Sequence, residues 1–439
     1  MSVKHEFPCV ETLPPLRGSP LMWDRSHVWH PFTQMQDWCA NDPVCIVEAH
    51  GARVRDAHGN WYLDGNSSIW TNLHGHRHPR LDGALQRQLA CFAHTSFLGL
   101  THPLAAQLCA QLCALWPPGT LTRAFLSDNG STAVEVALKM AAQYWQLLKQ
   151  PQRTRLVAFD GAYHGDTMGA SSLGGVPIFT ERFAAWQFPV DRVDALDSLE
   201  LLPGNEVAAV VIEPLVQGAN QIRLWPSGLL AAVREWCDRH DVFLIADEVM
   251  TGFGRTGTLF ACEQEGVVPD FVALAKGLTG GYMPLAATLT TERVFQAFLG
   301  GPDRTLYYGH SYCGHALACA VALENIAILR EEGVLSRLQR QIQLLAELLG
   351  EHLSPHPNVH SIRQRGFLAG IELRNTDGSA FAAELGVGGK VCVAAREFGL
   401  LTRPIRDTVV LMPPYCTSDA ELEGAVRAIV SGLRAFLGA

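Results

Sequence analysis

The sequence predicts an α/β protein with a large, mostly parallel sheet and a smaller α+β unit. Helical stretches such as 131–148 alternate with short apolar runs, and buried strands separated by helices are typical of a parallel sheet covered on both faces. Beyond residue 330 the pattern changes to long amphipathic helices at 335–353 and 419–437, with short strands at 366–373 and 408–412. The apolar runs of the first part are LVAF at 156–159, VAAVVIEP at 207–214, VFLIADEV at 242–249 and FVALAK at 271–276.

The remaining elements complete the predicted organisation. Residues 1–26, which include Pro14, Pro15, Gly18 and Pro20, are expected to form an irregular arm. The stretch 44–64 alternates and turns at Gly51 and Gly59, which predicts an antiparallel meander. Having no core of its own, it should join the C-terminal unit. We therefore predict an arm and part of the small domain in 1–74, a large domain in 75–330, and the rest of the small domain in 331–439.

Composition narrows the classes of function. The net charge of −9 argues against a nucleic-acid surface or an anionic membrane as partner. The 12 cysteines lie in apolar surroundings without any CxxC pair, which is typical of buried thiols in a reducing compartment. No signal peptide, apolar span or metal site is predicted, so we expect a cytoplasmic protein.

Three features fall at the carboxyl ends of predicted strands, where open α/β sheets bind ligands. Asp247 ends the apolar run FLIA, although an acidic residue there is often only a helix cap. Lys276 leaves FVALA into the glycine-rich turn GLTGGY, which is unusual because ammonium groups are costly to bury. Asn129, Gly130 and Ser131 open a helix whose free N–H groups can seat a phosphate.

Together these features indicate pyridoxal 5′-phosphate (PLP) as cofactor. Its phosphate would lie on the start of the helix at Gly130 and Ser131, its ring nitrogen on Asp247, and its aldehyde carbon on Lys276, the Schiff-base lysine. Lys276, once freed by substrate, would carry the proton. Tyr163, in GAYHGDT, could stack on the ring, although an ordinary packed aromatic is the alternative.

The segment GFGRTG at 252–257 follows a strand and suggests a competing function, that of a nicotinamide oxidoreductase. In a nicotinamide site the first glycine follows its strand directly and the third lies inside a helix. Here five residues intervene after the strand, and the next helix is expected only after the motif. The nicotinamide hypothesis is therefore weak.

The run LIADEVMTGFGRTGTLFACEQEGVVPDFVALAKGLTGGYMPLAA at 244–287 resembles the PLP-binding core of class III (ω-amino acid) aminotransferases of fold type I. WHPFTQM (29–35), DGNSSIWTNLHGHRHP (64–79) and GAYHGDTMGA (161–170) are similar to the branch that aminates 7-keto-8-aminopelargonic acid (KAPA, or 8-amino-7-oxononanoate) in biotin biosynthesis. The resemblance covers residues 27–415. Another class III enzyme acting on a diamine or ω-amino acid is the nearest alternative, and a PLP-fold protein without activity is a third.

The resemblance also implies roles for individual residues. Arg403 in LTRPI would grip the KAPA carboxylate, although a surface charge is the alternative. Asp166 and Arg255 would shape the site. Gly309 and Ser311 in GHSY would enter the phosphate site of a neighbouring subunit, which implies a homodimer with shared active sites.

The amino donor is where this chain departs from the branch that uses S-adenosylmethionine. That branch reads HPY, SSWW and GPTF where this chain has His30-Pro31-Phe32, Ser67-Ser68-Ile69-Trp70 and Gly309-His310-Ser311-Tyr312. Both substituted positions belong to the donor and substrate pocket of that branch. Here Phe32 lacks the hydroxyl of the tyrosine, and Ile69 lacks the aromatic face of the tryptophan. Trp70, if its stretch is extended, would point to the opposite side. We therefore expect lysine to serve as donor at least as well as S-adenosylmethionine.

Overall fold

The computed structural model describes residues 18–438, and their contacts divide them into two compact units. The first unit holds 18–48 and 54–61, and the second holds 49–53 and 62–438. The predicted domain boundaries after residues 74 and 330 stay predictions. None of the helices in the described part of the chain is long and apolar enough to cross a bilayer.

The first unit contains two short helices, α1 (Pro20–His27) and α2 (Met35–Ala40). The prediction of an irregular arm was wrong for residues 20–26, and its residues 1–17 lie outside the described chain. Ser19 caps α1 by accepting a hydrogen bond from the backbone N–H of Met22 at 3.3 Å, and Pro20 occupies the first turn. Proline is favoured there because its missing N–H would have no helical partner.

Strands β1 (Ile46–His50), β2 (Arg53–Asp56) and β3 (Trp61–Asp64) occupy the stretch predicted as a meander. The chain turns between them at Gly51 and Gly59, whose φ angles are +54° and +92°. These angles are left-handed, and glycine adopts them without a steric penalty. Further along, β3 pairs in parallel with β15 (Leu400–Leu401) of the C-terminal region.

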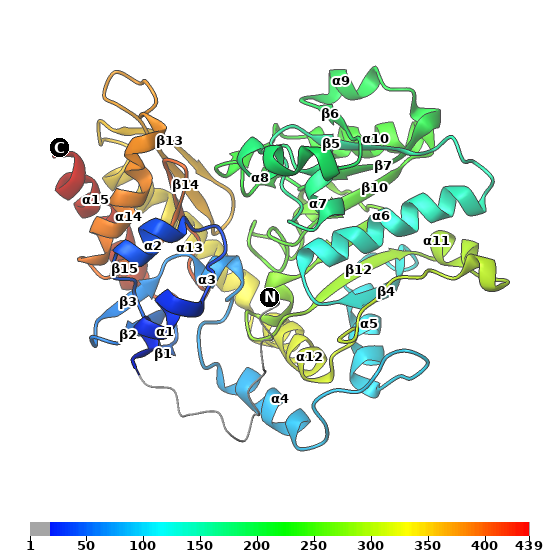
Figure 1. Ribbon diagram of the computed structural model, residues 1–439, viewed down its shortest axis with the longest axis horizontal. Coiled ribbons are helices and arrows are strands. Elements are labelled where there is room, and N and C mark those ends of the chain that lie inside the picture. Colours follow the sequence, from blue (N-terminus) through cyan, green and yellow to red (C-terminus); the bar gives the residue numbers. More distant parts are fainter. Residues whose placement is uncertain (1–17, 439) are drawn as a thin grey trace, which may run out of the picture. The chain divides into compact units, whose positions relative to one another are not determined.

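The largest sheet of the second unit confirms the predicted α/β class (Figure 1). β5, β6, β7, β10 and β11 run parallel to one another. β12 is antiparallel to both β11 and β4, so β4 runs in the same direction as β11. Across this sheet the order is β4 (Leu121–Ser127), β12 (Ala286–Thr291), β11 (Phe271–Leu274), β10 (Phe243–Asp247), β7 (Val207–Ile212), β5 (Arg155–Phe159) and β6 (Asp191–Val193).

Both faces of this sheet are buried, as the near-continuous apolar runs require. In β10, Phe243 and Ile245 join the apolar cluster that contains α6 (Gly130–Leu147), while Leu244 and Ala246 join a second cluster with α10 (Leu229–His240) and α12 (Ala316–Glu331). Figure 1 shows α6 lying across the sheet. The other helices of this region are α4 (Pro79–Leu89), α5 (Pro103–Ala114), α7 (Met168–Leu173), α8 (Pro177–Thr180), α9 (Leu196–Glu200) and α11 (Glu292–Ala297).

The C-terminal region has its own sheet, in the order β13 (Val359–Gln364), β14 (Ala369–Leu373), β17 (Thr408–Leu411) and β16 (Pro404–Ile405), and its pairs are antiparallel. Helices α13 (Val334–His352), α14 (Val387–Arg396) and α15 (Asp419–Leu437) accompany this sheet, and α14 and α13 both pack on α15. Strands and helices therefore occur here as predicted. The eleven cysteines of the described chain are free thiols.

Candidate active site

Polar residues follow the carboxyl ends of five strands that run in the same direction. Asp247 ends β10, and Lys276 follows β11, the neighbouring strand. The carboxyl ends of parallel strands meet at one edge of the sheet, so these side chains gather there. The other three strands of this set are β4, β5 and β7, which are followed by Asn129–Ser131, Tyr163–His164 and Glu213 respectively.

Asp247 is buried, and each of its carboxylate oxygens accepts one hydrogen bond. Its Oδ2 accepts a hydrogen bond from Nδ1 of His164 at 2.7 Å, and its Oδ1 accepts one from the backbone N–H of Val249 at 3.1 Å. Nε2 of His164 is buried without a hydrogen-bond partner among the described residues. Sequence reasoning missed His164, although it lies inside GAYHGDT. The pair gives the site a carboxylate held in one orientation by two donors.

Lys276 lies at the start of the 3₁₀ turn that follows β11, with a left-handed φ of +43°. Its Nζ lies 4.7 Å from the centre of the Trp70 ring. Burial lowers the pKa of the Lys276 ammonium below its ordinary value, and the carboxylates of Asp247 and Glu213 oppose that shift without reversing it. A lysine with a lowered pKa is a nucleophile and a proton carrier near neutral pH.

The start of α6 has the geometry that the sequence predicted for a phosphate seat. Asn129 caps the helix by accepting from the Thr132 N–H at 3.0 Å, and the helix begins at Gly130. The first N–H groups of a helix have no partner inside it. A Cβ at Gly130 would lie 2.8 Å from Cγ1 of Val249, so the start of this helix approaches the end of β10 more closely than a side chain would allow.

Tyr163 is fixed at both its backbone and its hydroxyl. Its N–H donates to Oε1 of Glu213 at 3.0 Å, and its hydroxyl donates to Oδ2 of Asp166 at 2.5 Å. Asp166 in turn donates its backbone N–H to Oγ of Ser131 at 3.2 Å, which joins the loop after β5 to the start of α6. Burial and the Asp166 carboxylate raise the pKa of the Tyr163 hydroxyl, so it stays protonated.

Glu213 is a buried carboxyl that sequence reasoning missed. Its second oxygen, Oε2, accepts from the N–H of Gly218 at 2.8 Å. Burial raises the pKa of Glu213 to about 7, Asp247 adds to this rise, and His164 opposes it. The signal was present in the sequence, because Glu213 follows the apolar run VAAVVI just as Asp247 follows FLIA.

Residues 67–70 are not extended, which corrects the basis for placing Trp70 away from the site. Ser67, Ser68, Ile69 and Trp70 all have left-handed φ angles, between +44° and +69°. This turn sets the Trp70 ring against Nζ of Lys276. An aromatic face therefore lies beside the lysine, whereas Ile69 is exposed.

Trp70 also packs against a small apolar cluster that leads toward Arg403. Ile405 also packs against this cluster, whose buried members are Val216, Ile222, Met250, Leu368, Val410 and Met412. Arg403, two residues before Ile405, has an exposed side chain without an ion pair among the described residues. A buried apolar cluster thus packs against both the Trp70 ring beside Lys276 and Ile405, which lies two residues after the exposed Arg403.

The remaining predicted residues lie in different environments. Arg255 is buried and donates to the carbonyl oxygens of Pro413 (2.8 Å) and Asn72 (3.1 Å), so it supports the segment after Trp70. Phe32, in the first unit, is 63% exposed. Gly309 and Ser311 lie in an exposed stretch. Their predicted contacts with substrate and with a second subunit stay predictions.

The segment GFGRTG forms consecutive turns, with left-handed angles at Gly254 and Gly257. Gly252 packs against the backbone of Glu248, where an added Cβ would lie 2.8 Å from the carbonyl oxygen. The helix that follows is a five-residue 3₁₀ turn, Ala261–Glu265. No glycine of the motif opens an α-helix, so the nicotinamide hypothesis has no structural support within the described residues.

Comparison with known proteins agrees with this geometry. The family model described as aminotransferase class-III matches residues 35–433. An adenosylmethionine-8-amino-7-oxononanoate aminotransferase of Nitratidesulfovibrio vulgaris is 47% identical, over 92% of this chain and 80% of that protein. The crystal structure of the enzyme of that name from Methanocaldococcus jannaschii has a TM-score of 0.92 at 34% identity, covering 95% of this chain and 98% of that one. A PLP-bound amine transaminase from an uncultivated Pseudomonas species has a TM-score of 0.88 at 31% identity, with 93% and 99% covered. The chain belongs to the class III aminotransferases.

Proposed function

We propose that this enzyme is a PLP-dependent transaminase that converts 8-amino-7-oxononanoate (KAPA) to 7,8-diaminononanoate. The observation that carries the proposal is the pairing of Asp247 and Lys276 at the ends of adjacent parallel strands, with Trp70 against the lysine. The aromatic ring of Trp70 beside Lys276 and the exposed guanidinium of Arg403 suit the aliphatic chain and the distal carboxylate of KAPA. The names of the relatives support the same substrate.

The residues of the site fit PLP. Gly165 leaves no room for a side chain, since an added Cβ would lie 2.0 Å from Oγ of Ser131, and this keeps the loop close to the start of α6. The Asp247 carboxylate suits a protonated ring nitrogen. Among residues 18–438, Lys276 Nζ makes no hydrogen bond or ion pair that would keep it from bonding to the aldehyde carbon of PLP. We infer that Gly130 and Ser131 hold the phosphate, and that Gly309 and Ser311 of a second copy complete that seat.

The protein's own groups would perform the remaining steps. When bound, PLP supplies an electron-accepting ring. Asp247, fixed by His164, keeps the ring nitrogen protonated. Lys276 Nζ takes a proton from the substrate carbon and returns it, and its lowered pKa favours the neutral amine that this requires. Tyr163, with its hydroxyl on Asp166, covers the ring. Arg403 binds the distal carboxylate of KAPA through a bidentate pair.

We propose S-adenosylmethionine as the amino donor, as in the names of the relatives. The expectation of lysine rested on Phe32, on Ile69 and on an extended stretch at 67–70. The left-handed turn removes the last of these grounds and provides the Trp70 ring for a sulfonium or an adenine. Single-turnover loss of the visible absorbance of the enzyme-bound cofactor, measured with each donor alone, decides between them. Conversion by lysine but not by S-adenosylmethionine would overturn the donor assignment, and no amination of KAPA with either donor would overturn the proposed function.

A homodimer with shared sites is the proposed assembly. The exposed side chains of Tyr307 and Tyr312, 82% and 57% accessible, flank Gly309 and Ser311 and favour a covering partner. Mixing two weak variants tests this proposal. Lys276→Ala subunits supply an intact Ser311, and Ser311→Asp subunits supply an intact Lys276, so mixed dimers should regain activity. Light scattering should give twice the chain mass, and a monomer would contradict the proposal.

A further inference from the structure

The turn at residues 67–70 is the most strained segment of the site. Four consecutive residues with side chains have left-handed φ angles there. Such angles are costly for L-residues because the Cβ approaches the following carbonyl oxygen, and they usually occur singly. The turn closes like one turn of a left-handed helix, with the N–H of Trp70 donating to the Asn66 carbonyl at 2.8 Å. A strained backbone persists only where its surroundings over-determine it.

Asp64 binds both the backbone and the side chain of Ser68 in this turn. Its Oδ1 accepts from the Ser68 N–H at 2.9 Å, and its Oδ2 accepts from Oγ of Ser68 at 2.7 Å and from Nε2 of His76 at 3.2 Å. Asp64 is 4% exposed. A second anchor is Oγ of Ser67, which donates to the Met412 carbonyl at 2.7 Å.

The turn determines where the Trp70 ring lies. The indole N–H donates to Oδ1 of Asn66 at 2.7 Å, and one face of the ring is presented to Nζ of Lys276. The ring edge lies over Gly218, where an added Cβ would be 3.2 Å from Cζ3. The ring thus forms a fixed wall between the lysine and the apolar cluster that includes Met250.

We propose that Asp64 is a positioning residue of this transaminase, which holds residues 67–70 in the left-handed turn and thereby keeps the Trp70 ring against Lys276. Asp64 does not touch the reacting atoms and acts through Ser68 and Trp70. The inference deepens the proposed function and rests on it only for the kinetic measurement. Loss of Asp64 should let the turn relax to ordinary angles and withdraw the ring from the lysine.

The test uses full-length enzyme labelled with 5-fluorotryptophan, with the Trp70 resonance assigned by Trp70→Phe. In cofactor-free protein, Asp64→Ala should shift or broaden the ¹⁹F resonance of Trp70, and Asp64→Asn, which keeps one acceptor oxygen, should do so less. In the loaded enzyme, kcat/KM for KAPA should fall at least tenfold through KM, while the visible absorbance of the cofactor on Lys276 is retained. An unmoved Trp70 resonance in Asp64→Ala would overturn the proposal, whatever the substrate proves to be.

Asp56 provides a matched control. It is also 4% exposed and also holds a turn through its carboxylate, accepting from the N–H groups of His58 and Asn60 at 2.9 Å each. Asp56→Ala should lower the stability of the protein but leave the Trp70 resonance and the KM for KAPA unchanged. Equal effects of Asp56→Ala and Asp64→Ala on that resonance and KM would show that Asp64 has a merely structural role. Adding Ser68→Gly to Asp64→Ala should restore part of kcat/KM, because glycine adopts left-handed angles without penalty. Absence of this rescue would show that Asp64 acts through its charge instead.

Discussion

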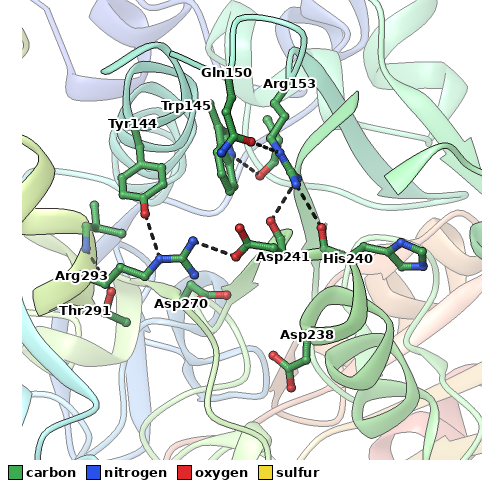
Figure 2. A network of polar contacts seen from close by, with 12 residues as sticks. Tyr144, Trp145, Gln150, Arg153, Asp238, His240, Asp241, Asp270, Thr291 and Arg293 are labelled. Carbon is green, nitrogen blue, oxygen red and sulfur yellow. Dashed lines mark hydrogen bonds and ion pairs between the residues drawn. The ribbon is translucent and has the colours of Figure 1, made fainter. Parts of the chain in front are cut away.

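Replacing Arg153 by methionine should loosen one side of the large sheet, because its guanidinium joins several segments of backbone. The side chain is 8% exposed and its guanidinium lies 4.2 Å from the centre of the Trp145 ring (Figure 2). Its acceptors are Oε1 of Gln150 (2.8 Å) and the carbonyl oxygens of Gly204 (3.3 Å), Val207 (3.1 Å), Asp241 (3.0 Å) and His240 (3.2 Å). The last two lie at the C-terminal end of α10, where carbonyls lack helical partners.

The expected cost follows from which carbonyls water can reach. The bonds to Gly204 and Val207 are buried, and the bonds to His240 and Asp241 are half-buried, so water can replace only the latter pair. The Gly204 carbonyl keeps the Val207 N–H as a donor, so the cost falls mainly on the Val207 carbonyl, and a buried acceptor that loses its donor costs about 1–3 kcal/mol. Burial of the guanidinium, which lowers the pKa of Arg153, offsets part of that cost. We expect a local destabilisation of about 2 kcal/mol.

Amide hydrogen exchange of the apoenzyme measures this local opening better than a melting curve, because a chain of this size need not unfold in one step. A loss of about 2 kcal/mol should speed exchange roughly 30-fold in peptides covering 203–210 and 237–243. The matched control is Arg155→Met, two residues along, which loses a partly exposed ion pair with Asp191 worth at most about 1 kcal/mol. Exchange no faster in Arg153→Met than in Arg155→Met would refute this reasoning.

Three further predictions concern the site. Lys276→Ala should lower kcat at least ~100-fold, because it removes the proton carrier, and should abolish the borohydride-sensitive absorbance of the bound cofactor. Turnover like that of wild type would contradict the assignment of Lys276. Arg403→Ala should weaken KAPA binding by about 2 kcal/mol, which is the lower end for a charge pair because the side chain is exposed. The donor half-reaction should be spared. An unchanged KM for KAPA would show that another residue binds the carboxylate. Glu213 has a pKa raised to about 7 in the folded protein from an ordinary 4.5, so the folded state holds the extra proton and its stability should fall as pH rises from about 4.5 through 7. In Glu213→Gln apoenzyme this decline, measured by urea unfolding across that range, should disappear, and an equal slope in both proteins would contradict the raised pKa.

Much of the site could be predicted from the sequence because the signals are local. A strand buried on both faces appears as a continuous apolar run, and a charged residue at its end marks the ligand-binding edge. That reasoning located Asp247, Lys276 and the start of α6. The same rule would have found Glu213, which also follows a buried strand. The Ser19-Pro20 helix start was equally local, but the prolines around it favoured an irregular arm.

The position of Trp70 was decided by tertiary structure alone. Four left-handed residues in a row contradict the local preference of each, so no periodicity or propensity predicts the turn. Besides Asp64, its supports include distant parts of the chain: Ser67 donates to Met412, and Arg255 joins the carbonyls of Asn72 and Pro413. The sequence by itself determined which strands deliver a carboxylate and a lysine to one edge, because burial and strand direction depend on short runs of residues. Where the ring beside that lysine lies depended on the folded chain, because short-range bonds to Asp64 and the long-range bond of Ser67 to Met412 together hold a backbone that is locally unfavourable.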